Sequence, residues 1–187
     1  MKKILYSVWE IVEVFLVALI AVAAIKYFLI QPFIVNGASM EPSFYDGDYL
    51  LVDELSYRFR DVARGDVVVF KAPQSEDSYY IKRVIGLPGE HVEIIDDQVT
   101  VYNDAYPEGE MLQEQYLSEG ILHTWSGNVS VVLKDGQYFV MGDNRLNSLD
   151  SRYWGPLEGD KIVGVVKVRL WPISSLSIFS IPEYIMQ

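Results

Sequence analysis

The 187-residue sequence contains no cysteine and only two histidines, His91 and His123. The absence of cysteine excludes disulfides, thiolate metal sites and a cysteine nucleophile. Two histidines are too few for a histidine-rich metal site, so neither a metal nor another cofactor is expected. Basic residues are also scarce, since 15 Lys and Arg stand against 26 Asp and Glu, for a net charge of -11. A chain this acidic binds nucleic acid poorly, because phosphates need a positive surface.

One long hydrophobic run is present at residues 11–30, which read IVEVFLVALIAVAAIKYFLI. About 20 mainly apolar residues are long enough to cross a bilayer as a helix. Glu13 and Lys26 lie near its ends, where side chains can extend to the headgroups. Two lysines precede the run and favour a cytoplasmic N-terminus. The sequence therefore predicts a cytoplasmic stub and one transmembrane anchor in residues 1–30, and an extracytoplasmic domain in residues 31–187.

The same run leaves a second interpretation open. The segment 21–23, Ala-Val-Ala, resembles the A-x-A site at which a secretory signal peptide is cleaved. However, the apolar residues continue to Ile30, and Glu10 and Glu13 fit poorly into the hydrophobic region of a signal peptide. A retained anchor is the favoured interpretation.

After Pro32 the sequence changes to short apolar runs separated by Gly, Asp, Asn and Pro. Each run has the length of a strand, and several are rich in Val, Ile and Tyr. The runs are Tyr49–Val52, Val67–Phe70, Tyr79–Ile85, His91–Ile95, Val99–Tyr102, Val129–Leu133, Gln137–Met141 and Lys161–Leu170. Asp96, Asp97 and Gln98 predict a hairpin turn between two of them. The expected fold is mostly β, an antiparallel sheet domain preceded by one transmembrane helix.

Two segments depart from this strand pattern. Residues 104–128 are polar with scattered aromatics, and are expected to form a small cap inserted into the β domain. The tail from Leu170 to Met186 is apolar but broken by Pro172 and Pro182. It predicts a last strand followed by a surface segment that contacts lipid, with a second membrane span as the less favoured alternative.

The first candidate for chemistry is Ser39, in the stretch NGASMEP at residues 36–42. Gly37 allows a backbone turn that a side chain would oppose, and Pro42 fixes the chain just beyond. The serine between them is suited to presentation at a surface, although an ordinary turn serine has the same pattern. Ser39 follows the predicted anchor by nine residues. It must therefore lie within about 30 Å of Ile30, close to the membrane.

A serine nucleophile needs a base, and Lys82 is the stronger candidate. It lies in the run YYIKRVIG at residues 79–86. If this is a strand, Lys82 and Arg83 point to opposite faces, so at least one of them packs against apolar neighbours. A buried lysine loses hydration, which favours the neutral amine that could accept a proton from Ser39.

Two alternatives to a lysine base stay open from the residues alone. Lys82 could be an ordinary strand lysine whose stem is packed and whose ammonium group lies in water. His123 could instead act as the base of a conventional triad, whereas His91 begins a strand and is expected at the surface.

The third stretch is residues 141–152, MGDNRLNSLDSR, which is dense in hydrogen-bonding groups. Such a loop can cross-link a site or satisfy its own backbone. A cation site is disfavoured, because Arg145 and Arg152 would compete for the carboxylates. Asp150 is expected to pair with Arg152 or with neighbours, and Ser148 is free to orient a nearby amine.

Four stretches together resemble the type I signal peptidases, especially the small bacterial kind with one N-terminal anchor. Gly37–Pro42 is similar to the nucleophile motif of that family, and Arg64–Phe70 to its next block. Tyr80–Glu90 is similar to the block that holds the lysine base, and Gly142–Arg152 to the last block. The order agrees, and the similarity spans residues 31 to about 170.

The resemblance implies a role for each matching residue. Ser39 would form an acyl-enzyme, Lys82 would act as general base, and Ser148 would hydrogen-bond and aim Lys82. The Ser39 backbone N–H would form part of the oxyanion hole, next to Gly37, where some members carry a serine that completes it. Met40 would help to form the substrate groove. Structural support of the last block would come from Asp143, Arg145, Asp150 and Arg152.

The resemblance also implies the substrates and the location. The protein would remove signal peptides from exported preproteins, cutting after small residues, at the plasma membrane and with its catalytic domain outside. The lipid bilayer and the protein export machinery are the other expected partners. The alternative is a membrane-tethered, non-catalytic module of signal-peptidase type that assists the assembly of surface proteins.

Overall fold

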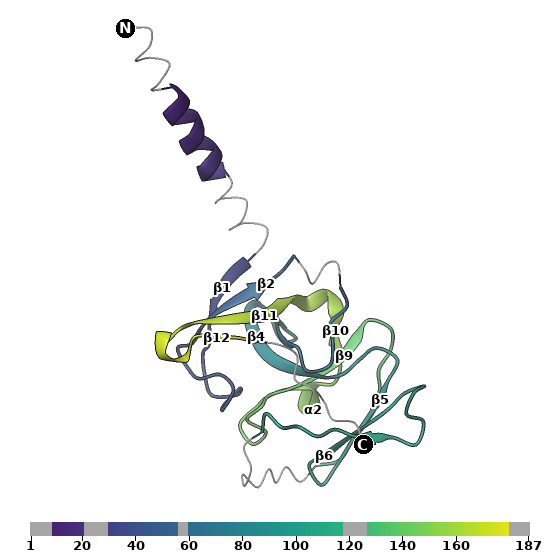
Figure 1. Ribbon diagram of the computed structural model, residues 1–187. Coiled ribbons are helices and arrows are strands. Elements are labelled where there is room, and N and C mark those ends of the chain that lie inside the picture. The colour runs from purple at the N-terminus through teal and green to yellow at the C-terminus, as the bar shows by residue number, and fades with distance from the viewer. Residues whose placement is uncertain (1–8, 21–29, 56–59, 118–126, 180–187) are drawn as a thin grey trace, which may run out of the picture.

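The computed structural model describes residues 9–20, 30–55, 60–117 and 127–179. Two antiparallel sheets form the body of the molecule, and the helical residues 9–20 lie apart from them (Figure 1). Within the described part of the chain, the prediction of a mostly β, antiparallel domain is confirmed.

The larger sheet has eight strands in the order β1-β2-β11-β3-β4-β9-β10, with β12 paired to β11. Its strands are β1 (Ile30–Ile34), β2 (Tyr49–Asp53), β3 (Val67–Ala72), β4 (Ser75–Gly86), β9 (Gln137–Met141), β10 (Leu157–Glu158), β11 (Ile162–Trp171) and β12 (Ser177–Ile178). The central strand β3 is buried at every position except Lys71, as its apolar sequence predicts. The sheet therefore carries most of the core of the protein.

The smaller sheet has four strands in the order β7-β6-β5-β8. They are β5 (His91–Ile95), β6 (Gln98–Tyr102), β7 (Glu110–Met111) and β8 (Val129–Val132). Asp96 and Asp97 form the two-residue loop between β5 and β6, with φ values of 48° and 63°. Positive φ at both positions is typical of a type I′ hairpin, so the predicted turn is confirmed.

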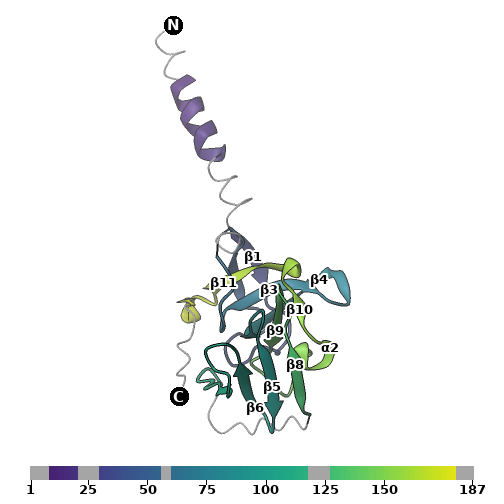
Figure 2. The same ribbon diagram turned by 90° about the vertical axis from the view of Figure 1, so that its right-hand side faces the viewer.

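The expected cap at residues 104–128 is one part of this smaller sheet. Residues 110–111 form β7 at its edge, and residues 118–126 lie outside the described part of the chain. The sequence predicted β5, β6 and β8 but neither β7 nor the separation of these strands into a second sheet, which lies beside the larger one (Figure 2).

The two sheets meet through one apolar cluster. Its buried members are Ile85, Val92, Ile94, Val99, Val101, Leu112, Leu133, Phe139 and Met141, drawn from both sheets. Gly86 ends β4, just before the chain enters the smaller sheet. A Cβ at this position would lie 2.4 Å from Val92 Cγ2, so only glycine permits β4 and β5 to pack this closely. Two further clusters lie against the larger sheet, around Phe70 and around Phe44.

Short helices interrupt the strands near the C-terminal end of the described chain. They are α2 (Ser151–Trp154), η2 (Gly159–Lys161) and η3 (Ile173–Ser175). Asp150 is the N-cap of α2 and accepts a bond from Arg152 N–H. The predicted run Lys161–Leu170 is present as β11. In the tail after it, the described strand is the two-residue β12, and residues 180–187 lie outside the described part.

Helical residues 9–20 carry an almost continuous set of exposed apolar side chains, such as Phe15 at 75%. Among the described residues, no helix has both the length and the apolar character needed to span a membrane. Residues 21–29, which complete the predicted anchor and include the alternative A-x-A site, are outside the described chain. The anchor at residues 11–30 therefore stays a prediction.

Candidate active site

Ser39 lies in the turn that follows β1. Gly37 has a φ of 94°, in the region that favours glycine, and its N–H donates a 2.7 Å hydrogen bond to Asp46 Oδ1. Met40 and Phe44 are fully buried and fix the turn to the core. Met40 was expected in the substrate groove, but its apolar side chain packs beneath the turn instead.

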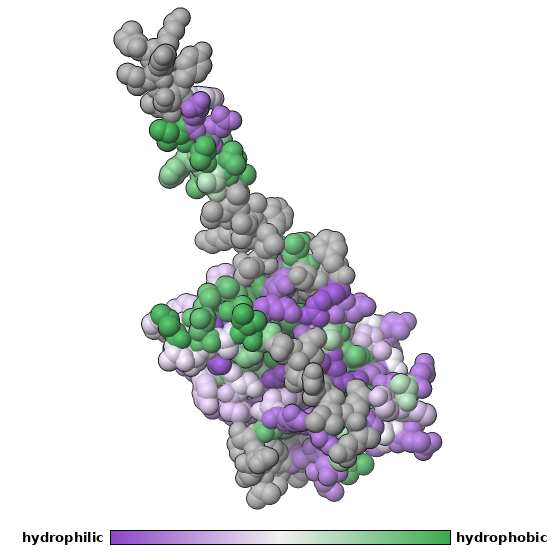
Figure 3. Space-filling model, viewed as in Figure 1, coloured by the Kyte–Doolittle hydropathy of each residue, from purple (hydrophilic) through white to green (hydrophobic). Residues whose placement is uncertain are grey.

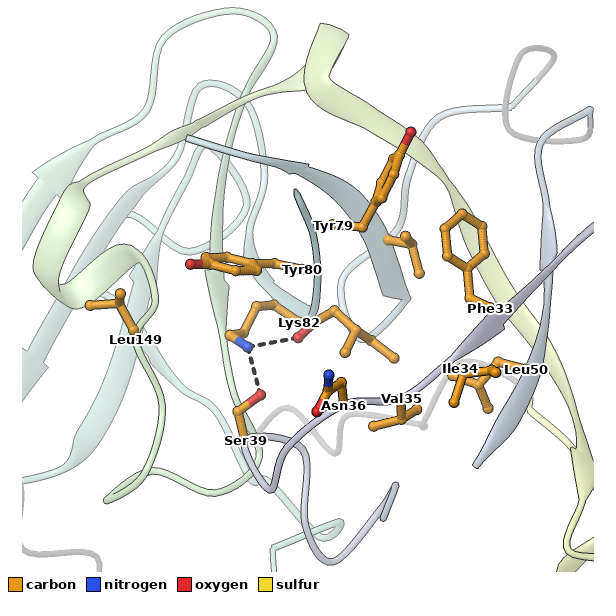
Figure 4. Close-up of a pocket in the computed structure, with 12 residues that line it drawn as sticks. Phe33, Ile34, Val35, Asn36, Ser39, Leu50, Tyr79, Tyr80, Lys82 and Leu149 are labelled. Carbon is orange, nitrogen blue, oxygen red and sulfur yellow. Dashed lines mark hydrogen bonds between the residues drawn. The ribbon is translucent and has the colours of Figure 1, made fainter. Parts of the chain in front are cut away.

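Lys82 reaches Ser39 from strand β4. Its Nζ lies 2.7 Å from Ser39 Oγ and 2.8 Å from the carbonyl oxygen of Ile81, as Figure 4 shows. The lysine is only 4% exposed. The structure thus brings the two residues within hydrogen-bond distance and removes the amine from bulk water.

The surroundings of Lys82 favour its neutral form. Burial is the main cause, and it lowers the pKa of Lys82 from 10.5 to about 8. The negative charges of Asp150 and Asp143 oppose this effect, while Arg152 adds to it. A substantial fraction of the amine is therefore free to accept a proton at mildly alkaline pH.

The loop before α2, residues 142–150, is referred to as the Ser148 loop. Asp150 and Arg152 form a bidentate ion pair, with Nε–Oδ1 and Nη2–Oδ2 distances of 2.8 Å each. Asp150 also accepts a 3.0 Å bond from Gly142 N–H, which closes the loop. Burial alone would raise the pKa of Asp150, but Arg152 and Gly142 hold it below its ordinary value.

Ser148 is buried within this loop, close to the backbone of Ser39. A Cβ on Gly142 would lie 2.2 Å from Ser148 Oγ and 2.5 Å from the Ser39 carbonyl oxygen. The Ser148 hydroxyl and the Ser39 carbonyl group therefore both pack against Gly142. The expected hydrogen bond from Ser148 to Lys82 is not formed, since Ser148 Oγ has no well-formed bond and Lys82 contacts Ile81 O. The hydroxyl does lie near enough to Asp150 to help lower its pKa.

Asp143 and Arg145 face residues that the sequence did not single out. Asp143 accepts two hydrogen bonds from Arg83, at 2.8 and 2.6 Å, and both side chains are buried. Arg145 pairs with Glu114, from the predicted cap. Strand alternation had placed one basic residue on each face of β4, and Arg83 is buried as deeply as Lys82. The sequence did not indicate a role for Glu114, because its partner Arg145 lies 31 positions away in the chain.

A pocket of about 290 Å³ opens beside Ser39 and Lys82. Its other lining residues are Phe33, Ile34, Val35, Asn36, Leu50, Val69, Tyr79, Tyr80, Ile81 and Leu149. Figure 4 shows the pair of Ser39 and Lys82 between Leu149 on one side and Phe33, Ile34 and Leu50 on the other. The lining is mainly apolar, as in sites that bind small aliphatic side chains.

His91 is not part of the pocket lining. His91 stacks on Tyr102, with ring centroids 5.0 Å apart, and its Nε2 lies 2.8 Å from Ser130 Oγ in the smaller sheet. His123 lies outside the described residues. Across the ranges that the structure describes, no group of three or more metal-ligating side chains is assembled.

Comparisons with known proteins agree on one family. The family model described as "Signal peptidase, peptidase S26" matches residues 8–171. The chain is 35% identical over 177 residues to "Probable signal peptidase I-2" of Synechocystis sp., covering 91% of this chain and 77% of that protein. It is 36% identical over 168 residues to "Signal peptidase I T" of Bacillus subtilis, covering 86% and 83% respectively.

Two further comparisons give the same family name. "Signal peptidase IB" of Staphylococcus aureus is 34% identical over 182 residues, which cover 89% of this chain and 91% of that protein. A crystal structure of a signal peptidase I from Enterococcus faecalis aligns with 57% of this chain and 97% of its own, at 31% identity and a TM-score of 0.46.

Proposed function

Because the chain belongs to the signal peptidase family, peptidase S26, and is a serine endopeptidase, we propose that it removes signal peptides from exported preproteins with Ser39 as nucleophile and Lys82 as general base. The observation that carries this proposal is the 2.7 Å distance between Ser39 Oγ and Lys82 Nζ. A nucleophile and a base within hydrogen-bond reach satisfy the first requirement for covalent catalysis.

In the acylation step, neutral Lys82 accepts the Ser39 hydroxyl proton while Oγ bonds to the scissile carbonyl carbon. The tetrahedral intermediate then collapses, the C–N bond breaks, and the new amine of the mature protein takes the proton from Lys82. In the deacylation step, Lys82 accepts a proton from water as the hydroxide attacks the ester. The released Ser39 oxygen recovers that proton, and the signal peptide leaves with a new carboxyl group.

Burial of Lys82 makes this chemistry feasible near neutral pH. An ordinary lysine is almost fully charged at pH 7 and has no lone pair to offer. A pKa of about 8 leaves a working fraction of neutral amine. Asp150 and Asp143 limit how far this pKa falls, so the amine stays basic enough to remove the hydroxyl proton.

The developing oxyanion needs donors close to Ser39. We assign the Ser39 backbone N–H to this role. The Gly37 N–H is committed to Asp46, at 2.7 Å, and glycine has no hydroxyl to offer, so Gly37 supplies turn geometry rather than a donor.

Substrate selectivity follows from the edge of β4 and the pocket beside it. β3 pairs with one edge of Tyr79–Lys82, whereas no described strand pairs with the other edge, because β9 reaches only to Arg83. An extended preprotein segment can add as a strand there. Alternate side chains before the cut would then face the pocket of about 290 Å³, whose mainly apolar lining can accept small aliphatic residues at the first and third positions.

Two observations support a place at the lipid bilayer. β1 begins at Ile30, the last residue of the predicted anchor, residues 11–30. An apolar C-terminal surface gathers on β11, η3 and β12, at the left of Figure 3, and consists of Leu170, Trp171, Ile173, Leu176 and Ile178. Their exposed fractions reach 83% at Ile178, which is costly in water and favourable against lipid. Alkaline washing of membranes that contain the full chain tests the anchor, since release into the supernatant would contradict it.

The proposed activity is tested by incubating the detergent-solubilised full chain with a preprotein that carries an A-x-A site. Mass spectrometry of the product should give a new N-terminus directly after that site. Replacing the alanine before the cut by phenylalanine should abolish the product, because the proposed specificity requires a small side chain at this position. Equal cleavage of both preproteins would contradict the assigned specificity.

A further inference from the structure

Glu114, in the segment after β7, reaches the base of the Ser148 loop. Its Oε2 accepts a 2.8 Å hydrogen bond from Arg145 Nη1, and Oε1 accepts a second bond from Nη2. The side chains of Arg145 and Glu114 are only 3% and 8% exposed. Although burial disfavours charge, Glu114 raises the pKa of Arg145 above its ordinary value, so the guanidinium stays charged.

Tyr116 links this ion pair to the strand that carries Lys82. Its hydroxyl donates to Glu114, and the Arg83 guanidinium lies 3.9 Å from the centroid of its ring. Arg83 follows Lys82 directly in β4 and holds Asp143 with two hydrogen bonds. Two residues of one segment thus contact both the strand of the base and the loop beside the nucleophile.

The Ser148 loop in turn contacts the backbone around Ser39. Asn144 N–H donates to Ser39 O at 3.0 Å, and Asn144 Nδ2 donates to Ala38 O at the same distance. On the far side, Arg152 Nη2 donates to the carbonyl oxygen of Arg145 at 2.8 Å. Arg145 therefore lies between the Glu114 carboxylate and the part of the loop that touches Ser39.

We propose that Glu114 and Tyr116 are positioning residues, which hold Arg83 and Arg145 so that Lys82 Nζ and Ser39 Oγ stay within hydrogen-bond distance. This inference rests on the proposed function, and it assigns a role to the segment 112–117 of the smaller sheet. Neither residue lines the pocket, so their effect on the reaction is exerted through their two arginine partners.

The position of the Ser148 loop beside Ser39 is set by polar contacts, and Arg145 takes part in them. The Ser148 loop has no strand pairing, and its backbone is fixed by polar contacts to Asp150, Arg152 and Ser39. Loss of the Glu114 carboxylate leaves the buried Arg145 charge without its main partner, which drives the side chain toward water. Small displacements of reacting groups then reduce the rate strongly.

The test compares Glu114→Gln and Tyr116→Phe with Glu108→Gln, an exposed glutamate just before β7. Rates are measured on the preprotein substrate with the full chain in detergent, below the unfolding temperature of each variant. Glu114→Gln should lower kcat about 10-fold or more while KM changes less than about twofold. Tyr116→Phe, which retains the ring, should have a smaller effect, and Glu108→Gln should behave as wild type.

The pH profile separates positioning from a purely structural role. Lys82 is faced by Asp150, Asp143 and Arg152, and burial is the largest cause of its lowered pKa. If the Ser148 loop loosens in Glu114→Gln, water reaches the Lys82 amine and the effect of burial on its pKa becomes smaller. The pH midpoint of the activity profile should then lie above the wild-type value. In a double-mutant cycle, adding Glu114→Gln to Arg145→Gln should cause little further loss.

Wild-type kcat and midpoint in Glu114→Gln would overturn the inference, as would a loss of rate that only tracks the folded fraction by circular dichroism. Additive losses in the Glu114 and Arg145 variants would equally overturn it. A wild-type chain that cuts no preprotein would instead overturn the proposed function, and the positioning role with it, so the two failures are distinguishable.

Discussion

Ser39 Oγ and Lys82 Nζ lie 2.7 Å apart although 43 positions separate the two residues in the chain. The turn after β1 supplies one and strand β4 supplies the other. The contact is shielded from water, because Lys82 is 4% exposed. Short distance and burial together are what a serine–lysine mechanism requires, since they provide both proton transfer and a neutral amine.

The activity should depend on pH through Lys82. Only the neutral amine accepts the Ser39 proton, so kcat/KM should rise with pH, pass a midpoint near the Lys82 pKa of about 8, and level off above it. A stopped assay over pH 6 to 10 measures this profile. A midpoint near about 6.5, the ordinary value for histidine, would favour a histidine base, and a flat profile with chemistry limiting would contradict the lysine mechanism.

Replacing Lys82 by methionine should stabilise the folded protein at neutral pH. The folded-state pKa is about 8, below the ordinary value of 10.5, so the folded state disfavours the charged form. The penalty is fully present below pH 8, shrinks as the pH rises toward 10.5, and vanishes above. At about 1.4 kcal/mol per pKa unit, the free energy of unfolding should increase by at most roughly 3 kcal/mol at pH 7.

Urea unfolding of the Lys82→Met variant at pH 7 measures this difference, with Lys71→Met as the control. Lys71 is the exposed lysine of the adjacent strand β3, and its replacement should change stability little. A Lys82→Met variant that is less stable than wild type at pH 7 would show that the buried amine is a net stabilising group.

Gly142→Ala should separate Ser39 from Lys82. The added Cβ would lie 2.5 Å from the Ser39 carbonyl oxygen, a backbone atom that no side-chain rotation can move away. Displacement of the turn should reduce kcat on the order of 100-fold. The matched control is Gly164→Ala in β11, where the Cβ would lie 2.6 Å from the Asp53 carbonyl oxygen.

The control should lower the melting temperature but retain kcat per folded molecule, because its clash is with β2 rather than with the site. Comparable losses of kcat in both variants would mean that the site responds to any strain in the larger sheet. In that case the close approach at Gly142 would have no special role.

Most of the longer strands were predictable from local sequence, whereas the two-residue strands β7 and β10 were not. His91–Ile95 and Gln137–Met141 were predicted with the bounds that the structure has, and most other runs agree to within one or two residues. Their apolar alternation is a local property. β1 was missed because Pro32 interrupts it and because the hydrophobic run before it favoured a helix. The separation into two sheets depends on contacts such as Gly86 with Val92, which no local pattern contains.

The site was predictable in part for the same reason. Ser39 and Lys82 lie in short motifs that are ambiguous alone but specific when all four blocks occur in order, and the Asp150–Arg152 pair spans only two positions. Met40 was misplaced because a buried methionine and a groove methionine have the same sequence signature. Glu114 and Arg83 could not be identified, because their roles arise from partners 31 and 60 positions away.

The most direct test of the serine–lysine assignment is cleavage of an A-x-A preprotein by wild type, Ser39→Ala, Lys82→Met and His123→Ala, each shown to be folded by circular dichroism. We expect wild type and His123→Ala to cut after the A-x-A site at similar rates, and Ser39→Ala and Lys82→Met to yield no product. Cleavage by Lys82→Met at the wild-type rate, together with loss of cleavage in His123→Ala, would contradict the assignment of Lys82 as the base.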